Sequence, residues 1–114
     1  MEVTMNGFHT GKYEVSAAQL DAMIANGTAL LIDVREPDEF ASGHIAGARN
    51  HPLATFDPAA LPPAEGKRLV LQCAGGKRSA MALDRCAQAG ATVDTHLGGG
   101  LAAWQEAGLP IVRD

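Results

Sequence analysis

Aromatic residues, cysteines and long apolar runs are all scarce in this chain of 114 residues. Only 4% of its residues are aromatic, so a core has to be built from Ala, Val, Ile, Leu and Met. No run approaches the roughly 20 apolar residues of a membrane span. The first 15 residues lack the basic and apolar regions of a secretory signal. These absences predict a globular, cytoplasmic protein.

Cysteine is the scarcity that says most about chemistry. The chain has two cysteines, Cys73 and Cys86, which are too few for a disulfide framework. In a reducing compartment such residues are thiols. There is no C-x-x-C motif, and none of the four histidines has a metal-ligand spacing with either cysteine. The sequence therefore predicts no metal site.

Positive charge is also in short supply, because the net charge is −4. This balance gives no reason to expect nucleic acid or an anionic membrane as the partner. A hydrophobic content of 46% with 19% charged residues is typical of a globular chain. We expect one domain over residues 13–114, preceded by a short lead-in at residues 1–12.

Apolar runs alternate with helical patterns along the chain. Short apolar runs predict strands at 29–34, 68–73 and 93–97, the first of them covered on both faces. Helices are predicted after a capping box at Ser16 and Gln19, from Pro37 onward, and at 79–89 and 101–107. This alternation predicts an α/β domain with a mostly parallel central sheet.

Cys73 occupies a distinctive place in this pattern, at the end of a predicted strand and just before a helix. Ligands of open α/β sheets bind at the carboxyl ends of strands, and amides before a helix can converge on one point there. Gly75 and Gly76 allow a tight loop, and Lys77 and Arg78 add positive charge. All of these features favour the thiolate, so the sequence predicts a nucleophilic Cys73 with a lowered pKa.

A plainer interpretation makes Cys73 the buried end of a strand, since free cysteine is often buried. The glycines and cations beside it favour a reactive site instead. Cys86 has no such neighbours and is predicted to pack in the core. Arg78 comes five positions after Cys73, whereas the loops of phosphate-cleaving enzymes have the arginine six positions after the cysteine. A loop that is one residue shorter encloses a smaller space. This spacing favours a single extra sulfur atom on the cysteine over a bound phosphate.

Three segments resemble the rhodanese family, specifically its single-domain members. They are "LLIDVREPDEFASGHIAGARNHPL" from Leu30, the loop "CAGGKRS" from Cys73, and "LGGGLAAWQEAGLPIV" from Leu97. The resemblance extends from about Tyr13 to Val112. It implies a three-layer α/β/α fold around a mostly parallel sheet of about five strands.

The resemblance also implies a sulfurtransferase that works by a ping-pong mechanism. Cys73 would take the outer sulfur of thiosulfate or a similar small anionic donor and pass it from a persulfide to cyanide in vitro, or to a thiol or protein cysteine in the cell. No metal or organic cofactor is implied. The substrate-binding residues would be those of the loop: Ala74, Gly75, Gly76, Lys77, Arg78 and Ser79. Their amides would cradle the persulfide, and Arg78 with Lys77 would bind the anionic end of the donor.

Other positions of the resemblance are given supporting roles. Asp33, Arg35 and Arg49 border the pocket or, as we favour, form an ion-pair network that holds the loop. His44 is expected to pack and hydrogen-bond, and Trp104 to lie in the core.

Two alternative functions remain at this stage. The first is a persulfide carrier or partner-docking module with little turnover of its own. The second is a phosphatase or arsenate reductase on the same fold, which the short loop disfavours. Ala74 stands where mercaptopyruvate enzymes have a glycine, which argues against that donor.

Overall fold

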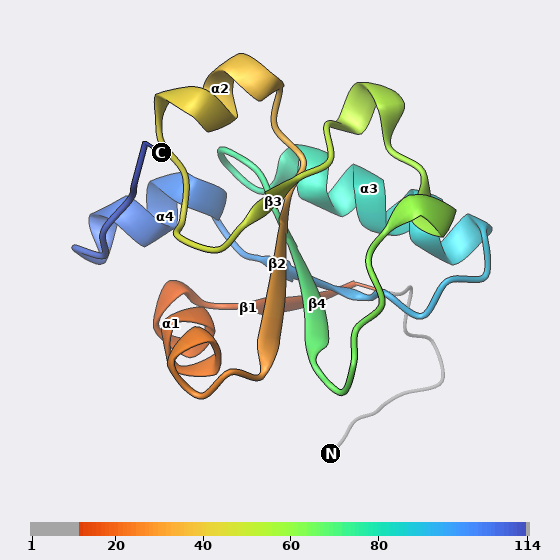
Figure 1. Ribbon diagram of the computed structural model, residues 1–114, viewed down its shortest axis with the longest axis horizontal. Helices are drawn as coiled ribbons and strands as arrows, with labels where there is room; N and C mark the ends of the chain where they lie inside the picture. The colour runs from red at the N-terminus through yellow and green to blue at the C-terminus, as the bar shows by residue number, and fades with distance from the viewer. Residues whose placement is uncertain (1–11, 114) are drawn as a thin grey trace.

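A five-stranded parallel sheet forms the centre of the computed structural model, which describes residues 12–113 (Figure 1). The strand order is β1-β5-β4-β2-β3, and every pairing is parallel. The strands are β1 (Tyr13–Val15), β2 (Ala29–Asp33), β3 (Arg49–Asn50), β4 (Arg68–Gln72) and β5 (Thr95–Leu97). The predicted parallel sheet of about five strands is confirmed.

Helices cover both faces of this sheet. They are α1 (Ala17–Ala25), α2 (Pro37–Ser42), α3 (Lys77–Gln88) and α4 (Gly100–Glu106), with 3-10 turns η2 (Leu53–Thr55) and η3 (Pro58–Ala60). In Figure 1, α1 and α4 lie on one side of the strands and α3 on the other. The three-layer α/β/α architecture is confirmed.

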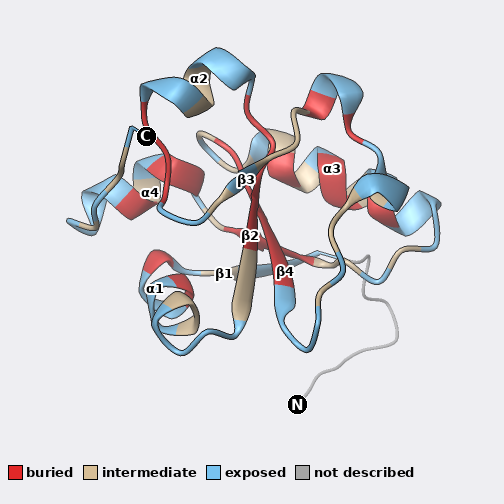
Figure 2. Cartoon of the chain, viewed as in Figure 1, coloured by how far each residue is buried: buried red, intermediate tan, exposed pale blue. Residues whose placement is uncertain are grey.

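Two apolar cores, one on each face, follow from the alternation of side chains along the strands. Leu31 and Ile32 are neighbours in β2 and point to opposite faces, and both are buried. Ile32 packs in the cluster that includes Leu83 of α3, whereas Leu31 packs in the cluster that includes Trp104 of α4. The buried positions accordingly run along the strands and the inner sides of the helices (Figure 2). The prediction that β2 is covered on both faces is confirmed.

The predicted start of α1 is also confirmed. The Ser16 hydroxyl accepts a hydrogen bond from the Gln19 amide at 3.1 Å, and the Gln19 side chain accepts one from the Ser16 amide at 2.8 Å. These reciprocal bonds satisfy two amides that the first helical turn leaves without a backbone partner.

Helix α3 begins at Lys77, two residues earlier than the predicted 79–89. The reason is Gly76, which caps the helix in a left-handed conformation (φ 104°) that turns the chain directly from the loop into the helix. Lys77 and Arg78 therefore lie in the first helical turn. The short strands β1 and β3 escaped prediction because three and two residues are too few to show a period.

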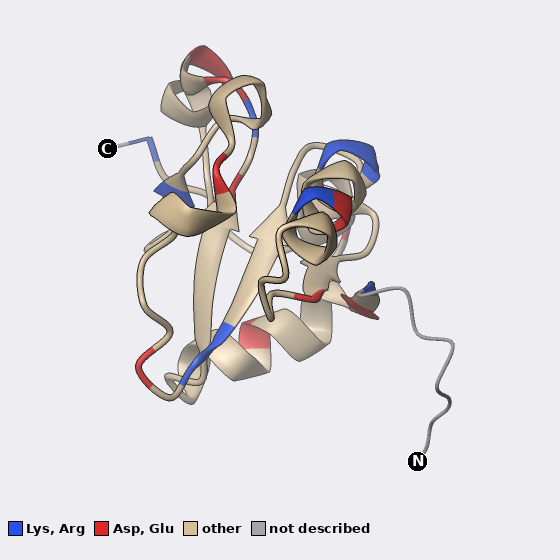
Figure 3. Ribbon diagram, turned by 90° about the vertical axis from the view of Figure 1, so that its right-hand side faces the viewer, with Lys and Arg blue, Asp and Glu red and all other residues tan. Residues whose placement is uncertain are grey.

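Within residues 12–113, no helix combines the length and the apolar character needed to cross a membrane. Lysine and arginine positions are interspersed with aspartate and glutamate positions along the described ribbon (Figure 3). The predicted lead-in at residues 1–12 lies almost wholly outside the described residues.

Candidate active site

Cys73 directly follows the last residue of β4, at the carboxyl end of a strand that lies between β5 and β2. Only 1% of its surface is exposed. Helix α3 starts four residues later, so the loop from Cys73 to Gly76 has to reverse the chain tightly. This is the edge at which a parallel sheet binds ligands.

Backbone amides surround the sulfur of Cys73. The amides of Gly76 and Ser79 donate to Sγ at 3.1 and 3.3 Å, and the Ser79 hydroxyl oxygen lies 3.6 Å away. Burial, the largest single influence, raises the pKa of the Cys73 thiol, but hydrogen bonds from Ser79, Gly76 and Gly75 outweigh it, so the pKa is lowered. The direction is the one expected, although amides and a hydroxyl cause it more than the cations.

The two glycines of the loop differ in what they do. Gly76 has positive φ, and a Cβ there would lie 3.3 Å from the Gly99 nitrogen, so the position requires glycine on both grounds. Gly75 is exposed, and a Cβ there would meet open space. Ala74 is half-buried and Lys77 is exposed, so both sit where a bound donor could reach them.

The start of α4 contacts the loop that follows β4 and holds it by backbone hydrogen bonds. The amides of Leu101 and Ala102 donate to the carbonyls of Cys73 and Ala74 at 2.8 and 3.0 Å. Gly100 makes this approach possible, because a Cβ at this position would lie 2.5 Å from the Cys73 carbonyl oxygen. The run Gly98-Gly99-Gly100 is the one local sign of this contact in the chain.

Arg78 is paired with Glu39 of α2. Its Nη1 and Nη2 atoms donate to the two carboxylate oxygens at 2.7 and 3.0 Å. The hydrogen bonds from Arg78 lower the pKa of Glu39 to about 2, although burial opposes the shift. The predicted anion-binding arginine therefore already holds one anion, and Glu39 is a residue of the site that the sequence did not single out.

Asp33 and Arg35 form a buried ion pair, with Arg35 Nη2 2.8 Å from Asp33 Oδ2. Arg35 also donates to the carbonyls of Gly43 and Glu39. The pair thus anchors α2, the helix that presents Glu39 to Arg78. Arg49 lies exposed on the edge strand β3, which β2 separates from β4.

Three predicted packing residues lie as expected. The His44 ring stacks on Phe40 at 3.8 Å between centroids, and its Nδ1 is 2.8 Å from the Phe40 carbonyl. Trp104 is buried and donates from Nε1 to the Pro110 carbonyl at 2.8 Å. Cys86 is fully buried in the core, and burial raises the pKa of its thiol to about 11.

A second residue that the sequence did not indicate is His96 of β5. Its Nδ1 lies 2.8 Å from the Ser79 hydroxyl oxygen, which in turn contacts the sulfur of Cys73. Nothing in the local pattern of the chain gave a signal for this residue, because the contact depends on β5 lying beside β4.

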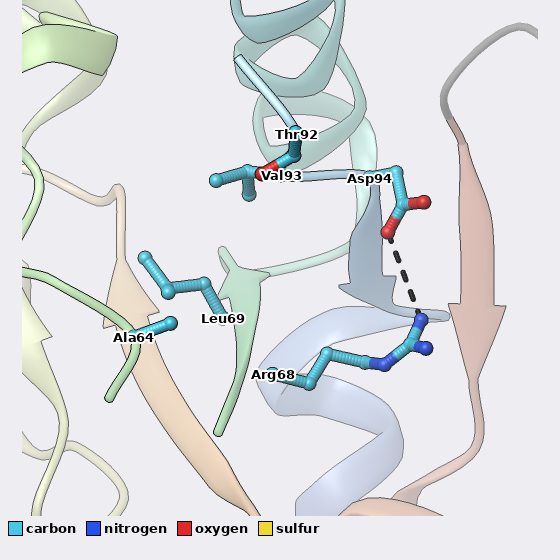
Figure 4. A pocket seen from close by; sticks show the side chains of 6 residues that line it. All are labelled: Ala64, Arg68, Leu69, Thr92, Val93 and Asp94. Atoms are coloured by element: carbon cyan, nitrogen blue, oxygen red, sulfur yellow. Dashed lines mark ion pairs between the residues drawn. The ribbon is translucent and has the colours of Figure 1, made fainter. Parts of the chain in front are cut away.

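A hollow of about 240 Å³ lies at the other end of β4, where the strand begins (Figure 4). Arg68 and Asp94 line it, with Arg68 Nη1 3.7 Å from Asp94 Oδ1. It is separated from Cys73 by the length of β4. The sulfur, its donor amides and the start of α3 all lie at the opposite edge, which identifies that edge as the candidate site.

The chain is similar to known proteins both in sequence and in structure. A family model described as a rhodanese-like domain matches residues 16–107. A human thiosulfate:glutathione sulfurtransferase is 33% identical, over 84% of this chain and 96% of its own. An uncharacterized Synechocystis protein is 42% identical over 87% of this chain, which spans only 55% of that protein.

Among solved structures, a rhodanese-related protein from Thermoplasma volcanium is 31% identical, with a TM-score of 0.75 over 89% of this chain and 98% of its own. The residues that the family model matches include the loop after Cys73, the glycines that support this loop and the segment that carries Glu39. The chain therefore belongs to the rhodanese-like family, and its rhodanese-like domain spans most of its length.

Proposed function

We propose that this protein is a sulfurtransferase that carries sulfane sulfur as a persulfide on Cys73. The observation that carries the proposal is the sulfur at the carboxyl edge of the sheet, held by the amides of Gly76 and Ser79. Such donors stabilise a thiolate, which is the nucleophilic form of cysteine. Family membership and a sulfurtransferase relative over nearly its whole length support the same reaction class.

The first half-reaction loads the cysteine. The Cys73 thiolate attacks the outer sulfur of thiosulfate or a similar donor, and the S–S bond of the donor breaks. Sulfite leaves with the electron pair of that bond, and a persulfide remains on Cys73. The loop amides then face the terminal sulfur and stabilise its negative charge.

The cations at the start of α3 bind the anionic end of the donor in this proposal. Lys77 is exposed and free to turn toward it. Arg78 uses one N–H of each terminal nitrogen on Glu39, and a guanidinium has five such donors, so others remain for the donor's oxygens. Asp33, Arg35 and Arg49 would support the site at a distance.

The second half-reaction unloads the cysteine. A thiophilic acceptor, which is cyanide in an assay and a thiol or protein cysteine in the cell, attacks the outer sulfur of the persulfide. The bond between the two sulfurs breaks, and Cys73 leaves as a thiolate. No electron is gained or lost overall, so no redox cofactor is required.

Mass spectrometry of the intact protein tests the loading step. Mixing with thiosulfate should add the mass of one sulfur atom and release sulfite, and cyanide should then remove that sulfur as thiocyanate. Cys73→Ser should gain nothing, whereas the matched variant Cys86→Ala should load like wild type. A folded wild-type protein that takes no sulfur from thiosulfate would contradict the donor assignment.

The same assay separates the two alternatives. A carrier module would load quickly from a donor protein and only slowly from thiosulfate. A phosphatase would hydrolyse a phenyl phosphate in a reaction that depends on Cys73. We predict that this protein does not catalyse that hydrolysis.

A further inference from the structure

A chain of polar contacts links the buried sulfur to the protein surface. Cys73 Sγ lies 3.6 Å from Ser79 Oγ, which lies 2.8 Å from His96 Nδ1, and His96 Nε2 lies 3.5 Å from Glu14 Oε2. His96 is 4% exposed, whereas the side chain of Glu14 is 69% exposed.

The sheet register builds this chain. Glu14 of β1 pairs with His96 of β5, and partners in neighbouring strands present their side chains on the same face. His96 in turn pairs with Leu71 of β4, which lies two residues before Cys73 and shares its face. Ser79 descends from the first turn of α3 onto the same face, so all four side chains meet there.

The hydrogens needed by this chain can be counted. The Gly76 carbonyl lies 3.1 Å from Ser79 Oγ, and this carbonyl and the Glu14 carboxylate can only accept hydrogen bonds. The contacts from Gly76 to Ser79 and from Ser79 to His96 each need one hydrogen, and Ser79 carries only one of the two. When the Ser79 hydroxyl points to the Gly76 carbonyl, His96 Nδ1 supplies the other. The separation of 3.5 Å between His96 Nε2 and Glu14 Oε2 is an ion-pair distance, which favours a ring that carries a second proton.

We propose that His96 is the internal base for Cys73, and that it takes the thiol proton by way of the Ser79 hydroxyl. The S–H bond of Cys73 breaks as its proton passes to Ser79 Oγ, and the hydroxyl proton of Ser79 passes to His96 Nδ1. The products are a thiolate, an unchanged hydroxyl that now points its hydrogen toward the sulfur, and an imidazolium whose Nε2–H faces Glu14. This inference rests on the proposed role of Cys73 as the nucleophile.

The charges around His96 decide when the imidazolium is stable. Burial, the largest influence, lowers the pKa of His96, and the charge of Lys12 lowers it further, whereas Glu14 raises it. Asp84 of α3 binds Lys12 at 2.9 Å and offsets part of its charge. One exposed carboxylate does not overcome burial, so in this proposal the negative charge of the thiolate, on the other side of the Ser79 hydroxyl, stabilises the imidazolium. We therefore expect the two groups to titrate as a pair.

Other charges near the sulfur do not replace this base. Arg78 interacts with the Cys73 charge from α3, but Glu39 neutralises it. Arginine keeps its proton over the working range and cannot accept the one that leaves the thiol. Among the groups that contact Ser79, His96 is the one able to gain a proton near neutral pH.

Thiolate absorbance near 240 nm, measured against pH without any sulfur donor, tests the inference. The Cys73→Ser variant serves as the blank, and Cys86 does not interfere below pH 9 because burial raises its pKa to about 11. His96→Asn keeps a polar group near the Nδ1 position but cannot become a cation. We expect it to raise the apparent pKa of Cys73 by about one unit or more, since a positive charge is lost near the sulfur.

Glu14→Gln should raise the same pKa by a smaller amount, because the imidazolium loses its carboxylate. The matched control is Glu106→Gln, an exposed carboxylate on α4, which should leave the pKa unchanged. A folded His96→Asn protein with an unchanged or lowered thiol pKa would overturn the proposal. If His96→Asn does not fold, Glu14→Gln decides, and no shift in that exposed variant would overturn it equally.

Proton NMR of the imidazole gives the reciprocal measurement. If the thiolate stabilises the imidazolium, Cys73→Ser has to lower the pKa of His96, and an unchanged value contradicts the pairing. Neither measurement involves sulfur transfer. Coupled titrations without sulfur uptake would refute only the proposed function, and sulfur uptake without coupling would refute only the role of His96.

Discussion

The loop after β4 and the last turn of α3 each hold a buried cysteine, and the two thiols behave in opposite ways. Cys73 is 1% exposed and Cys86 is 0% exposed, so access to solvent does not distinguish them. The pKa of Cys73 is nevertheless lowered, whereas burial raises the pKa of Cys86 to about 11.

The difference lies in the hydrogen-bond donors around each sulfur. Cys86 sits within a helix whose amides are already bonded to carbonyls, and apolar side chains surround it. Cys73 lies before the same helix, where the first amides have no carbonyl partner and turn toward the sulfur instead. Burial alone raises the pKa of a thiol, whereas hydrogen bonds from the backbone amides at the start of a helix lower it.

Replacing each cysteine in turn should give the largest difference between the two positions. Cys73→Ser should abolish sulfur uptake from thiosulfate, because the serine hydroxyl does not ionise at neutral pH. Cys86→Ala should keep the loading rate within about twofold but lower the free energy of unfolding by about 1 kcal/mol, as expected for a small core cavity. Rapid-quench mass spectrometry and chemical denaturation measure the two effects. Equal loss of sulfur uptake in both variants would contradict the distinction.

Gly100→Ala should damage the loop from the side of α4. The new Cβ would collide with the Cys73 carbonyl, and the position has a φ of 61°. We expect the free energy of unfolding to fall by about 2 kcal/mol or more, with at least tenfold slower loading.

Gly27→Ala is the matched control for this change. Its φ of 72° is similar, but a Cβ there meets nothing within 4 Å, so it should cost only the backbone strain of about 1 kcal/mol. Denaturation curves of the two variants compare them. Equal destabilisation, with normal loading in both, would show that the close approach of α4 does not hold the loop.

Ser79→Ala should move Cys73 part of the way toward Cys86. It removes the hydroxyl but leaves the hydrogen bond that the Ser79 backbone amide donates to the sulfur. The pKa of Cys73 should rise because a donor to the thiolate is lost, so less thiolate is present and loading near neutral pH should slow by up to about tenfold. Ser42→Ala removes an exposed hydroxyl elsewhere and should leave the rate unchanged. Stopped-flow loading rates measured over a pH range test the shift, and a flat comparison with wild type would contradict it.

The smallest effect is expected at the pair between Glu39 and Arg78. The pKa of Glu39 is lowered to about 2 in the folded protein, so its contribution to stability is complete above pH 4.5, the ordinary value, and is lost as the pH falls toward 2. Both side chains are about one-third exposed, so solvent screening should keep the contribution below about 1 kcal/mol. Denaturation of wild type and Glu39→Gln at pH 6 and pH 2.5 measures it. A difference that grows on acidification would contradict this sign.

Local patterns were enough to predict much of the fold. The capping box at Ser16, the apolar run of β2 and the proline at the start of α2 each act within a few residues, so they can be recognised in the chain itself. The contrast between Cys73 and Cys86 was also visible, because glycines and cations adjoin only one of them.

The rest of the site depends on which elements become neighbours in space. Gly100 is important because α4 approaches the loop, Glu39 because α2 faces α3, and His96 because β5 pairs with β4. No short stretch of sequence contains both partners of any of these contacts. The sequence also assigned Arg78 to a substrate anion without indicating that Glu39 would already bind it.

Thiosulfate labelled at its outer sulfur tests the central claim most directly, that the hydrogen-bonded thiol and not the apolar one accepts sulfur. The wild-type protein is loaded, alkylated to trap persulfides and digested, and the label is mapped to peptides. The label should lie on the peptide that contains Cys73, with none on the peptide that contains Cys86. Label on Cys86, or no label on a folded protein, would contradict the claim.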